Sequence, residues 1–137
     1  MAMKDRIKGW AHLGVPAVDL EASLKWYIDN LGFELVYEKE LPDVPCHAAF
    51  IRKGDVELEI YQNDAAMIEE LKTRKDGHID HLALKVDDVY AAFEEMKKVD
   101  CVFLDQEVQT LPFYEKGVAW FTVLGPNGEK VEFNQVL

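Results

Sequence analysis

The feature that most constrains this chain is an internal repeat, which is the first thing to establish in any sequence. His12-Leu13 and His81-Leu82 are each followed, seven residues after the histidine, by an aspartate that can begin a helix. The ends of the two halves repeat as well, because Glu59-Ile60-Tyr61-Gln62 recurs as Glu132-Phe133-Asn134-Gln135. Each half therefore begins with a histidine strand and ends with a glutamate strand.

Hydrophobic periodicity predicts the order strand, helix, strand, strand, strand in both halves, an α+β fold of two βαβββ modules. The predicted strands cover residues 10–15, 33–38, 46–52, 56–62, 78–86, 100–105, 118–124 and 130–136. Asp19 and Gly32 bound the first helix, residues 63–74 form a short linking helix, and Asp87 or Asp88 caps a helix with the apolar face Val89, Phe93, Met96 and Val99. Residues 106–116 form a loop with a strand edge, and residues 125–128 form a turn.

The length of 137 residues fits a single domain over residues 1–137. Its first module, with the linking helix, covers residues 1–74, and its second covers residues 75–137. The net charge is 15 − 26 = −11, with Lys and Arg scattered along the chain, so neither nucleic acid nor a membrane surface is expected as a partner. We find no signal peptide and no long apolar run, which predicts a soluble cytoplasmic protein. Cys46 and Cys101, far apart, are interpreted as buried thiols.

Four residues on the less apolar strand faces form the candidate site. Two imidazoles and two carboxylates in one cavity would carry a high desolvation cost, which a divalent cation removes. A single histidine in a strand is more often an ordinary core or surface residue, and a single glutamate is usually solvated, so the residues alone leave both interpretations open. The recurrence in register favours the metal site, whose candidate ligands are His12, Glu59, His81 and Glu132.

Three similar residues are interpreted as lying outside the site. Glu57 lies on the same strand face as Glu59, but the repeat aligns it with Lys130, which does not bind a metal ion. His78 aligns with Gly9 and falls on the opposite strand face from His81. We expect both to be exposed strand-end residues, and His47, beside Pro45, to belong to a loop or rim.

The chain resembles the vicinal oxygen chelate superfamily, also called the glyoxalase/bleomycin resistance/dioxygenase fold, over nearly its whole length. The resemblance lies in the stretch from His12 to Leu31-Gly32-Phe33 and in the closing stretch from Gly125-Pro126-Asn127-Gly128 to Glu132-Phe133. It implies paired βαβββ modules that form a cupped mixed sheet around a divalent metal ion, and it places the ligands at the four residues named above. Ni, Zn, Co, Mn and Fe all suit a set of two histidines and two glutamates.

The four-ligand set most resembles glyoxalase I (lactoylglutathione lyase), which implies a lyase or isomerase that transfers a proton through a metal-stabilised enediolate. The general base would be Glu132 or Glu59. Alternatives are a methylmalonyl-CoA epimerase-like isomerase, an iron-dependent dioxygenase and a metal-free binding module for small molecules such as drugs. No basic cluster matches the carboxylates of glutathione; Arg52, Lys85 and Lys116 are candidates by placement only.

The substrate is expected to be a small molecule held in an apolar cup. The predicted pocket residues are Trp10, Phe50, Arg52, Tyr61, Phe113 and Trp120. Residues 111–114, with two exposed aromatic side chains, are expected to cover the site. Exposed strand edges predict a homodimer, and so does the resemblance to a superfamily whose members usually form dimers.

Overall fold

The structure is a computed structural model that describes residues 1–124 and 130–137, so the predicted turn at residues 125–128 lies outside the described residues. The chain divides into two compact units. The first unit consists of residues 12–80, and the second unit consists of residues 1–11 together with residues 81–137. The boundary between halves thus follows Asp80, and the N-terminal segment joins the second half. That the whole chain forms one domain stays a prediction.

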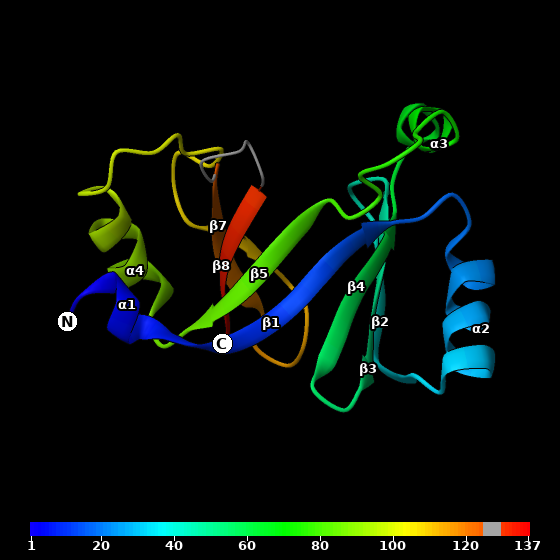
Figure 1. Cartoon of the computed structure of the whole chain (residues 1–137), viewed down its shortest axis with the longest axis horizontal. Coiled ribbons are helices and arrows are strands. Elements are labelled where there is room, and N and C mark those ends of the chain that lie inside the picture. The colour runs from blue at the N-terminus through cyan, green and yellow to red at the C-terminus, as the bar shows by residue number, and fades with distance from the viewer. Residues whose placement is uncertain (125–129) are drawn as a thin grey trace. The chain divides into compact units, whose positions relative to one another are not determined.

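The first unit is a sheet with strand order β2-β3-β4-β1 and two helices (Figure 1). Neighbouring strands among β2, β3 and β4 are antiparallel, whereas β1 runs parallel to β4 with Leu13 opposite Leu58. The strands are β1 (Ile7–Pro16), β2 (Glu34–Leu41), β3 (Cys46–Lys53) and β4 (Val56–Gln62), and the helices are α2 (Leu20–Leu31) and α3 (Ala65–Leu71).

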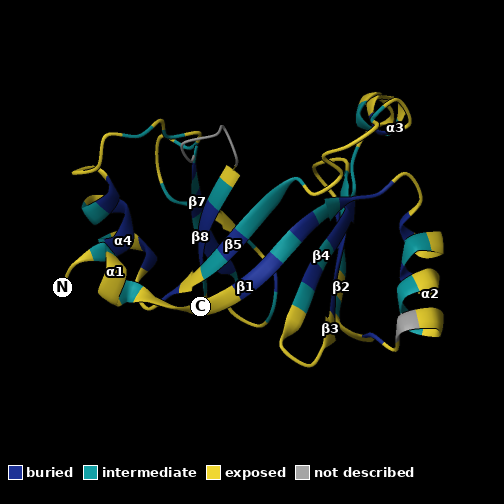
Figure 2. Cartoon of the chain, in the orientation of Figure 1, coloured by how far each residue is buried: buried dark blue, intermediate teal, exposed yellow. Residues whose placement is uncertain are grey.

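Helix α2 covers one face of this sheet and forms its core. Ile51 and Ile60 are fully buried there, and burial of such a side chain stabilises the fold by about 1.5–3 kcal/mol. The other buried members of this core are Ala17, Leu20, Leu24, Phe33, Ala49 and Leu58 (Figure 2). Because side chains alternate along a strand, the neighbours Glu59 and Tyr61 of β4 point to the opposite face. The apolar packing therefore determines which side of the sheet can carry the site.

The predicted ends of helix α2 are confirmed. The Asp19 carboxylate accepts a hydrogen bond from the backbone N–H of Ala22 at 3.0 Å. Gly32 adopts the left-handed conformation with φ 73°, which glycine reaches without a steric penalty, and its N–H donates to the Ile28 carbonyl. Within the described residues, no helix is long and apolar enough to cross a membrane.

The second unit has strand order β1-β5-β8-β7-β6 and again packs a helix on one face of its sheet (Figure 1). Helix α4 begins at an Asp88 cap and buries its apolar face against β7 and β8. The elements are α1 (Met3–Arg6), β5 (His81–Val86), α4 (Val89–Met96), β6 (Gln109–Leu111), β7 (Val118–Leu124) and β8 (Lys130–Val136). The predicted α+β fold class with two βαβββ modules is confirmed.

The predicted strand at residues 100–105 is wrong, because Phe103 forms only an isolated bridge to Val123. The Asp105 carboxylate accepts a hydrogen bond from the backbone N–H of Thr122 at 2.8 Å, and this side-chain contact takes the place of a regular ladder bond. Helix α4 ends at Met96, which leaves Val99 exposed rather than on the apolar face. Helix α1 was not predicted from the sequence.

Candidate metal site

The structure places the two halves of the repeat in the same register. Strand β1 pairs with β4 so that Gly14 lies opposite Glu59, and β5 pairs with β8 so that Ala83 lies opposite Glu132. Both pairings are parallel, and Gly14 and Ala83 each follow their histidine by two residues. The repeat detected in the sequence is therefore a repeat of sheet geometry.

The last residue of the repeated motif supports the same register independently of any metal ion. The side-chain oxygen of Gln62 accepts a hydrogen bond from the backbone N–H of Leu20, at the start of α2. The side-chain oxygen of Gln135 accepts one from Val89 at the start of α4, also at 2.9 Å. In each half the glutamate and the helix-binding glutamine thus keep their three-residue spacing and their roles.

In the first unit, His12 and Glu59 form a pair on the sheet face opposite α2. His12 is buried, at 2% exposure, and its Nε2 atom lies 3.5 Å from Glu59 Oε2. The ring of Phe50 packs edge-on against the His12 imidazole, with ring centroids 5.6 Å apart. Phe50 also lies opposite Glu59 in the β3–β4 ladder, so one aromatic side chain borders both members of the pair.

In the second unit, His81 and Glu132 form the corresponding pair. His81 Nε2 lies 3.6 Å from Glu132 Oε1, and both side chains are about one-tenth exposed. The side-chain amide of Asn134 donates a hydrogen bond to the other carboxylate oxygen, Glu132 Oε2, at 3.1 Å. The sequence analysis did not assign this role to Asn134, although the residue lies within the repeated motif, where it aligns with Tyr61.

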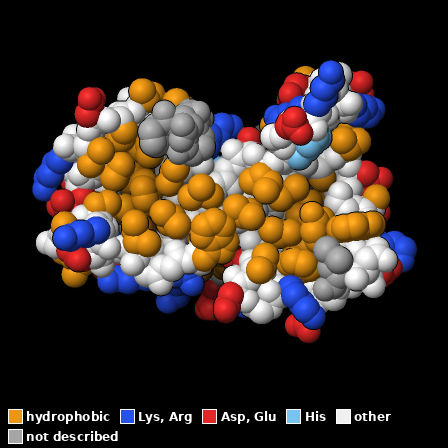
Figure 3. Space-filling model, viewed as in Figure 1, with side chains coloured by type: hydrophobic (Ala, Val, Ile, Leu, Met, Phe, Trp, Pro, Cys, Tyr) orange, Lys and Arg blue, Asp and Glu red, His pale blue; other side chains and the backbone are white. Residues whose placement is uncertain are grey.

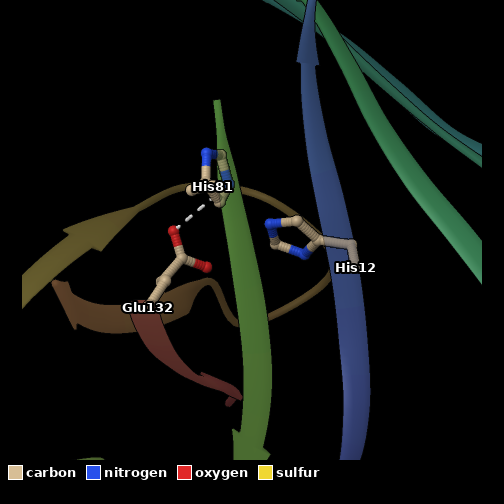
Figure 4. Close-up of side chains that lie close together, drawn as sticks. All are labelled: His12, His81 and Glu132. Atoms are coloured by element: carbon tan, nitrogen blue, oxygen red, sulfur yellow. Dashed lines mark ion pairs between the residues drawn. The ribbon is translucent and has the colours of Figure 1, made fainter. Parts of the chain in front are cut away.

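Three of the four predicted ligands offer donor atoms that all lie within 4.8 Å of one another, namely those of His12, His81 and Glu132 (Figure 4). Two ligand atoms on one cation, each about 2.1 Å from it, are separated by about 3.0 Å in octahedral geometry and about 3.4 Å in tetrahedral geometry. The His–Glu separations of 3.5 and 3.6 Å lie just above these values and exceed the length of a charge-assisted hydrogen bond, about 2.7–2.9 Å. This donor set therefore fits a divalent cation. The complete four-ligand set stays a prediction.

Glu57 differs from the prediction that it is an exposed strand-end residue. Its side chain is 16% exposed and accepts hydrogen bonds from Arg52 Nε at 3.0 Å and Arg52 Nη2 at 2.6 Å. The two residues face each other in the β3–β4 ladder. Glu57 therefore forms an ion pair with the Arg52 guanidinium group. Arg52 is a predicted pocket residue, and its Nε and Nη2 atoms are engaged in this contact.

The two remaining histidines lie partly as predicted. His78 is exposed, as predicted, but it precedes β5, which begins at His81 rather than at residue 78. His47 lies within β3 rather than in a loop, and its Nε2 atom is 2.8 Å from Glu38 Oε1. Cys46 and Cys101 are free thiols and are half-buried; burial raises the pKa of Cys46.

The predicted pocket residues differ widely in exposure. Phe50, Tyr61 and Phe113 are buried, Trp120 is half-buried, and Trp10 is 43% exposed. Burial, together with the nearby carboxylates of Asp80 and Glu59, raises the pKa of Tyr61 far above its usual value. Because Phe113 is only 3% exposed, residues 111–114 do not present two exposed aromatic side chains, contrary to the prediction. That these residues line a substrate pocket stays a prediction.

The fold and the candidate site agree with a family match over most of the chain. Residues 9–133 match the model of the Glyoxalase/Bleomycin resistance protein/Dioxygenase superfamily, and the chain belongs to this superfamily. The predicted resemblance is thereby confirmed. Among solved structures, methylmalonyl-CoA epimerase from Mycobacterium tuberculosis is similar with a TM-score of 0.75 and 19% identity, over 96% of this chain and 89% of the other. At that identity the likeness shows the fold alone.

Two further relatives are similar in sequence at different levels. YwbC of Bacillus subtilis, an uncharacterized protein, is 32% identical over 127 residues, or 90% of this chain and 94% of its own. Ethylmalonyl-CoA/methylmalonyl-CoA epimerase of Cereibacter sphaeroides is 25% identical over 128 residues, which cover 91% of this chain and 96% of the enzyme. The epimerase relative favours the epimerase alternative of the sequence analysis over the glyoxalase I interpretation.

Proposed function

We propose that this protein is a divalent-metal-dependent isomerase that moves a proton at a carbon atom next to a carbonyl group. The observation that carries the proposal is the cluster of His12, His81 and Glu132, whose donor atoms lie within 4.8 Å of one another. A divalent cation in this cluster would supply a Lewis acid for two oxygen atoms of a substrate. The superfamily match and the epimerase relative support proton transfer as the reaction.

The substrate class that we propose is a branched dicarboxylic acyl thioester of the methylmalonyl-CoA kind. Its thioester carbonyl and its carboxylate are both attached to the carbon atom that exchanges its proton, so two oxygen atoms can be held together. The support comes from the similarity to the Cereibacter enzyme over 91% of this chain. We therefore rank this substrate above the glutathione hemithioacetal that the glyoxalase I interpretation requires.

The two carboxylates of the site have different surroundings, which suggests different roles. Asn134 holds one oxygen of Glu132, which fixes the orientation of this carboxylate and suits a permanent ligand. The Glu59 side chain is 18% exposed, against 10% for that of Glu132. We propose that Glu59 is both a ligand of the cation and the general base that takes the proton from the substrate carbon, since a base needs access to the substrate.

The experiment that tests this function follows proton exchange at the reacting carbon. The metal-loaded protein is incubated with (2R)-methylmalonyl-CoA in D₂O, and loss of the C2 proton is followed by NMR. We expect exchange with the wild type and a rate lower by about 10²–10⁴-fold in Glu59→Gln, the usual contribution of a general base. Turnover of the hemithioacetal of methylglyoxal and glutathione, without exchange of the C2 proton of methylmalonyl-CoA, would favour the glyoxalase I interpretation over the epimerase interpretation.

A further inference from the structure

A row of three polar or amphipathic side chains crosses the sheet of the second unit, next to the row that carries Glu132. Lys85 of β5 lies opposite Asn134 of β8, and Asn134 lies opposite Trp120 of β7, on three strands that lie side by side (Figure 1). Directly paired residues point to the same face of a sheet, and Asn134 follows Glu132 by two residues. Lys85, Asn134 and Trp120, the polar row, therefore lie on the face that carries Glu132.

The packing on the other face agrees with this assignment. Val86 and Phe133 are buried in the core that contains helix α4. Because side chains alternate along a strand, their sequence neighbours Lys85 and Asn134 point away from that core. The same alternation applies to Trp120 in β7, whose two neighbours in sequence are buried members of the core. The polar row is thus on the side of the sheet that α4 leaves uncovered.

Two side chains of the polar row have no partner within the described residues. The exposed Lys85 forms no ion pair there, and the indole of the half-buried Trp120 forms no hydrogen bond or ring contact. The chain has 26 acidic and 15 basic residues, so the unpaired lysine does not reflect a shortage of carboxylates. Asp87, the acidic residue nearest to Lys85 in sequence, is paired with Arg6 at 3.3 Å. The row therefore offers an ammonium group and an indole N–H to a ligand.

The corresponding row of the first unit has a different character. There Pro16 of β1 lies opposite Tyr61 of β4, and Tyr61 lies opposite Ala48 of β3. All three residues are buried. The repeat therefore keeps a histidine and a glutamate in each half, but in this row it places a cation in the second half and none in the first. A substrate with a negative charge on one side of its reacting carbon would match this difference.

We propose that Lys85 and Trp120 form an anion-binding subsite that recognises the carboxylate of the substrate acyl group. Neighbouring strands lie about 4.8 Å apart, so the two residues flank β8 and can reach one group above Asn134. One oxygen of the carboxylate accepts hydrogen bonds from the Lys85 ammonium and the Trp120 indole N–H, which leaves its other oxygen for the cation. The inference rests on the proposed function and adds specificity-determining residues to it.

The position of the subsite favours a carboxylate of the acyl group over a phosphate of the CoA carrier. Asn134 is one strand step of about 7 Å from Glu132, and the carboxylate on the reacting carbon must lie near the cation. The phosphates are much farther from the reacting carbon along the carrier. Phosphate sites also commonly combine an arginine fork or a helix N-terminus, whereas this row offers one ammonium group and one neutral donor.

The central test measures binding of malonate, which has two carboxylates on one carbon, to the Zn²⁺-loaded protein by isothermal titration calorimetry. Lys85→Met keeps an apolar stem and removes the charge, and we expect it to weaken malonate binding by about 10–100-fold, as for loss of a hydrogen bond to a charged group. Lys85→Arg keeps the charge and should retain most of the affinity. Lys75→Met, at an exposed lysine of the first unit, is the matched control and should bind malonate like the wild type.

A second readout follows the indole N–H resonances in proton–nitrogen correlation NMR spectra. We expect malonate to shift the Trp120 resonance in the wild type and to leave it unshifted in Lys85→Met at the same concentration. Trp26, on helix α2 of the first unit, is an internal control whose resonance should not move. The spectrum of Trp120→Phe identifies the Trp120 resonance. This readout does not depend on turnover.

A second probe separates the carboxylate from the phosphates of the carrier. Adenosine 3′,5′-bisphosphate has phosphates of the carrier without an acyl group, and we expect Lys85→Met to bind it like the wild type. If Lys85→Met weakens binding of the bisphosphate as much as binding of malonate, or more, the assignment to the acyl carboxylate is overturned. Absence of malonate binding in the wild type would overturn it as well.

The outcomes also separate this inference from the proposed function. If the wild type exchanges the C2 proton of methylmalonyl-CoA and Lys85→Met binds malonate as tightly as the wild type, the subsite is overturned and the proposed function stands. If malonate binding depends on Lys85 but the wild type exchanges no C2 proton, the subsite is supported and the proposed reaction fails.

Discussion

At the residue scale, the site depends on which of two neighbouring glutamates faces the histidine. Glu57 and Glu59 lie on one face of β4, about 7 Å apart along the backbone. Glu57 accepts two hydrogen bonds from Arg52, whereas Glu59 has a carboxylate oxygen 3.5 Å from the His12 imidazole. The ladder partners explain the difference, because Arg52 lies opposite Glu57 and Phe50 lies opposite Glu59.

We therefore predict that Glu59→Ala abolishes tight metal binding and turnover, since it removes a negatively charged ligand. Glu57→Ala should keep the metal ion and cost less than about 1 kcal/mol of stability, because its ion pair lies at a partly exposed position. Metal stoichiometry by elemental analysis and melting temperature with and without metal would be measured for both variants. Loss of the metal ion in Glu57→Ala with retention in Glu59→Ala would show that the assigned register is wrong by one strand step.

If neither variant loses the metal ion, Glu132 would be the only carboxylate ligand. A site with His12, His81 and Glu132 alone keeps three coordination positions open, as in iron-dependent oxygenases. The dioxygenase alternative would then gain support over proton transfer.

At the scale of elements, each half joins its last strand to the first turn of its helix through a glutamine. Gln62 binds Leu20 N–H and Gln135 binds Val89 N–H, and both bonds satisfy a helix N-terminal donor that has no partner within the helix. The contact fixes the distance between the helix and the strand that carries the glutamate. The glutamine therefore has a structural role in each half of the repeat, and this role does not depend on the metal site.

We predict that Gln62→Ala and Gln135→Ala each lower the free energy of unfolding by about 0.5–1.5 kcal/mol, the usual net value of such a hydrogen bond. Urea denaturation would measure both, with Gln109→Ala as a control, because the Gln109 side chain donates its hydrogen bond to the carbonyl of the exposed residue Glu107. A destabilisation confined to one of the two variants would contradict the equivalence of the halves.

At the scale of the whole molecule, a cation bound to the native protein should stabilise it against unfolding. A metal ion present at 100 times its dissociation constant contributes about 2.7 kcal/mol. We predict that chelation followed by dialysis lowers the melting temperature by roughly 5–10 °C, as this energy implies for a chain of this size. Adding back the metal ion should restore it, and an unchanged melting temperature would argue against a tightly held cation.

The homodimer also remains a prediction at this scale. Large hydrophobic side chains are exposed in both units, among them Trp10 and Trp26, and hydrophobic side chains lie on the surface of each unit in Figure 3. Such exposed apolar surface is typical of association sites. Light scattering at micromolar concentration should give about twice the 15.7 kDa mass of one chain. A mass equal to one chain would contradict the prediction.

The sequence by itself determined most of the local elements and the register of the repeat. The bounds of β4, β7 and β8 follow from alternation, and the caps at Asp19 and Asp88 follow from helix-start chemistry, because both signals depend on residues close together in the chain. The pairing of His12 with Glu59 and of His81 with Glu132 could be predicted for a related reason. The repeat supplies a second copy that fixes which strand faces are equivalent.

Only the tertiary structure decided which distant side chains meet. Asp105 takes the N–H of Thr122 in place of a backbone ladder bond, and the Gln135 side chain reaches the Val89 N–H at the start of α4. None of these contacts has a periodic signal, because each joins residues whose separation is set by strand pairing or by the path of a connection. Local sequence fixes the direction of a side chain, and the packed fold fixes its partner.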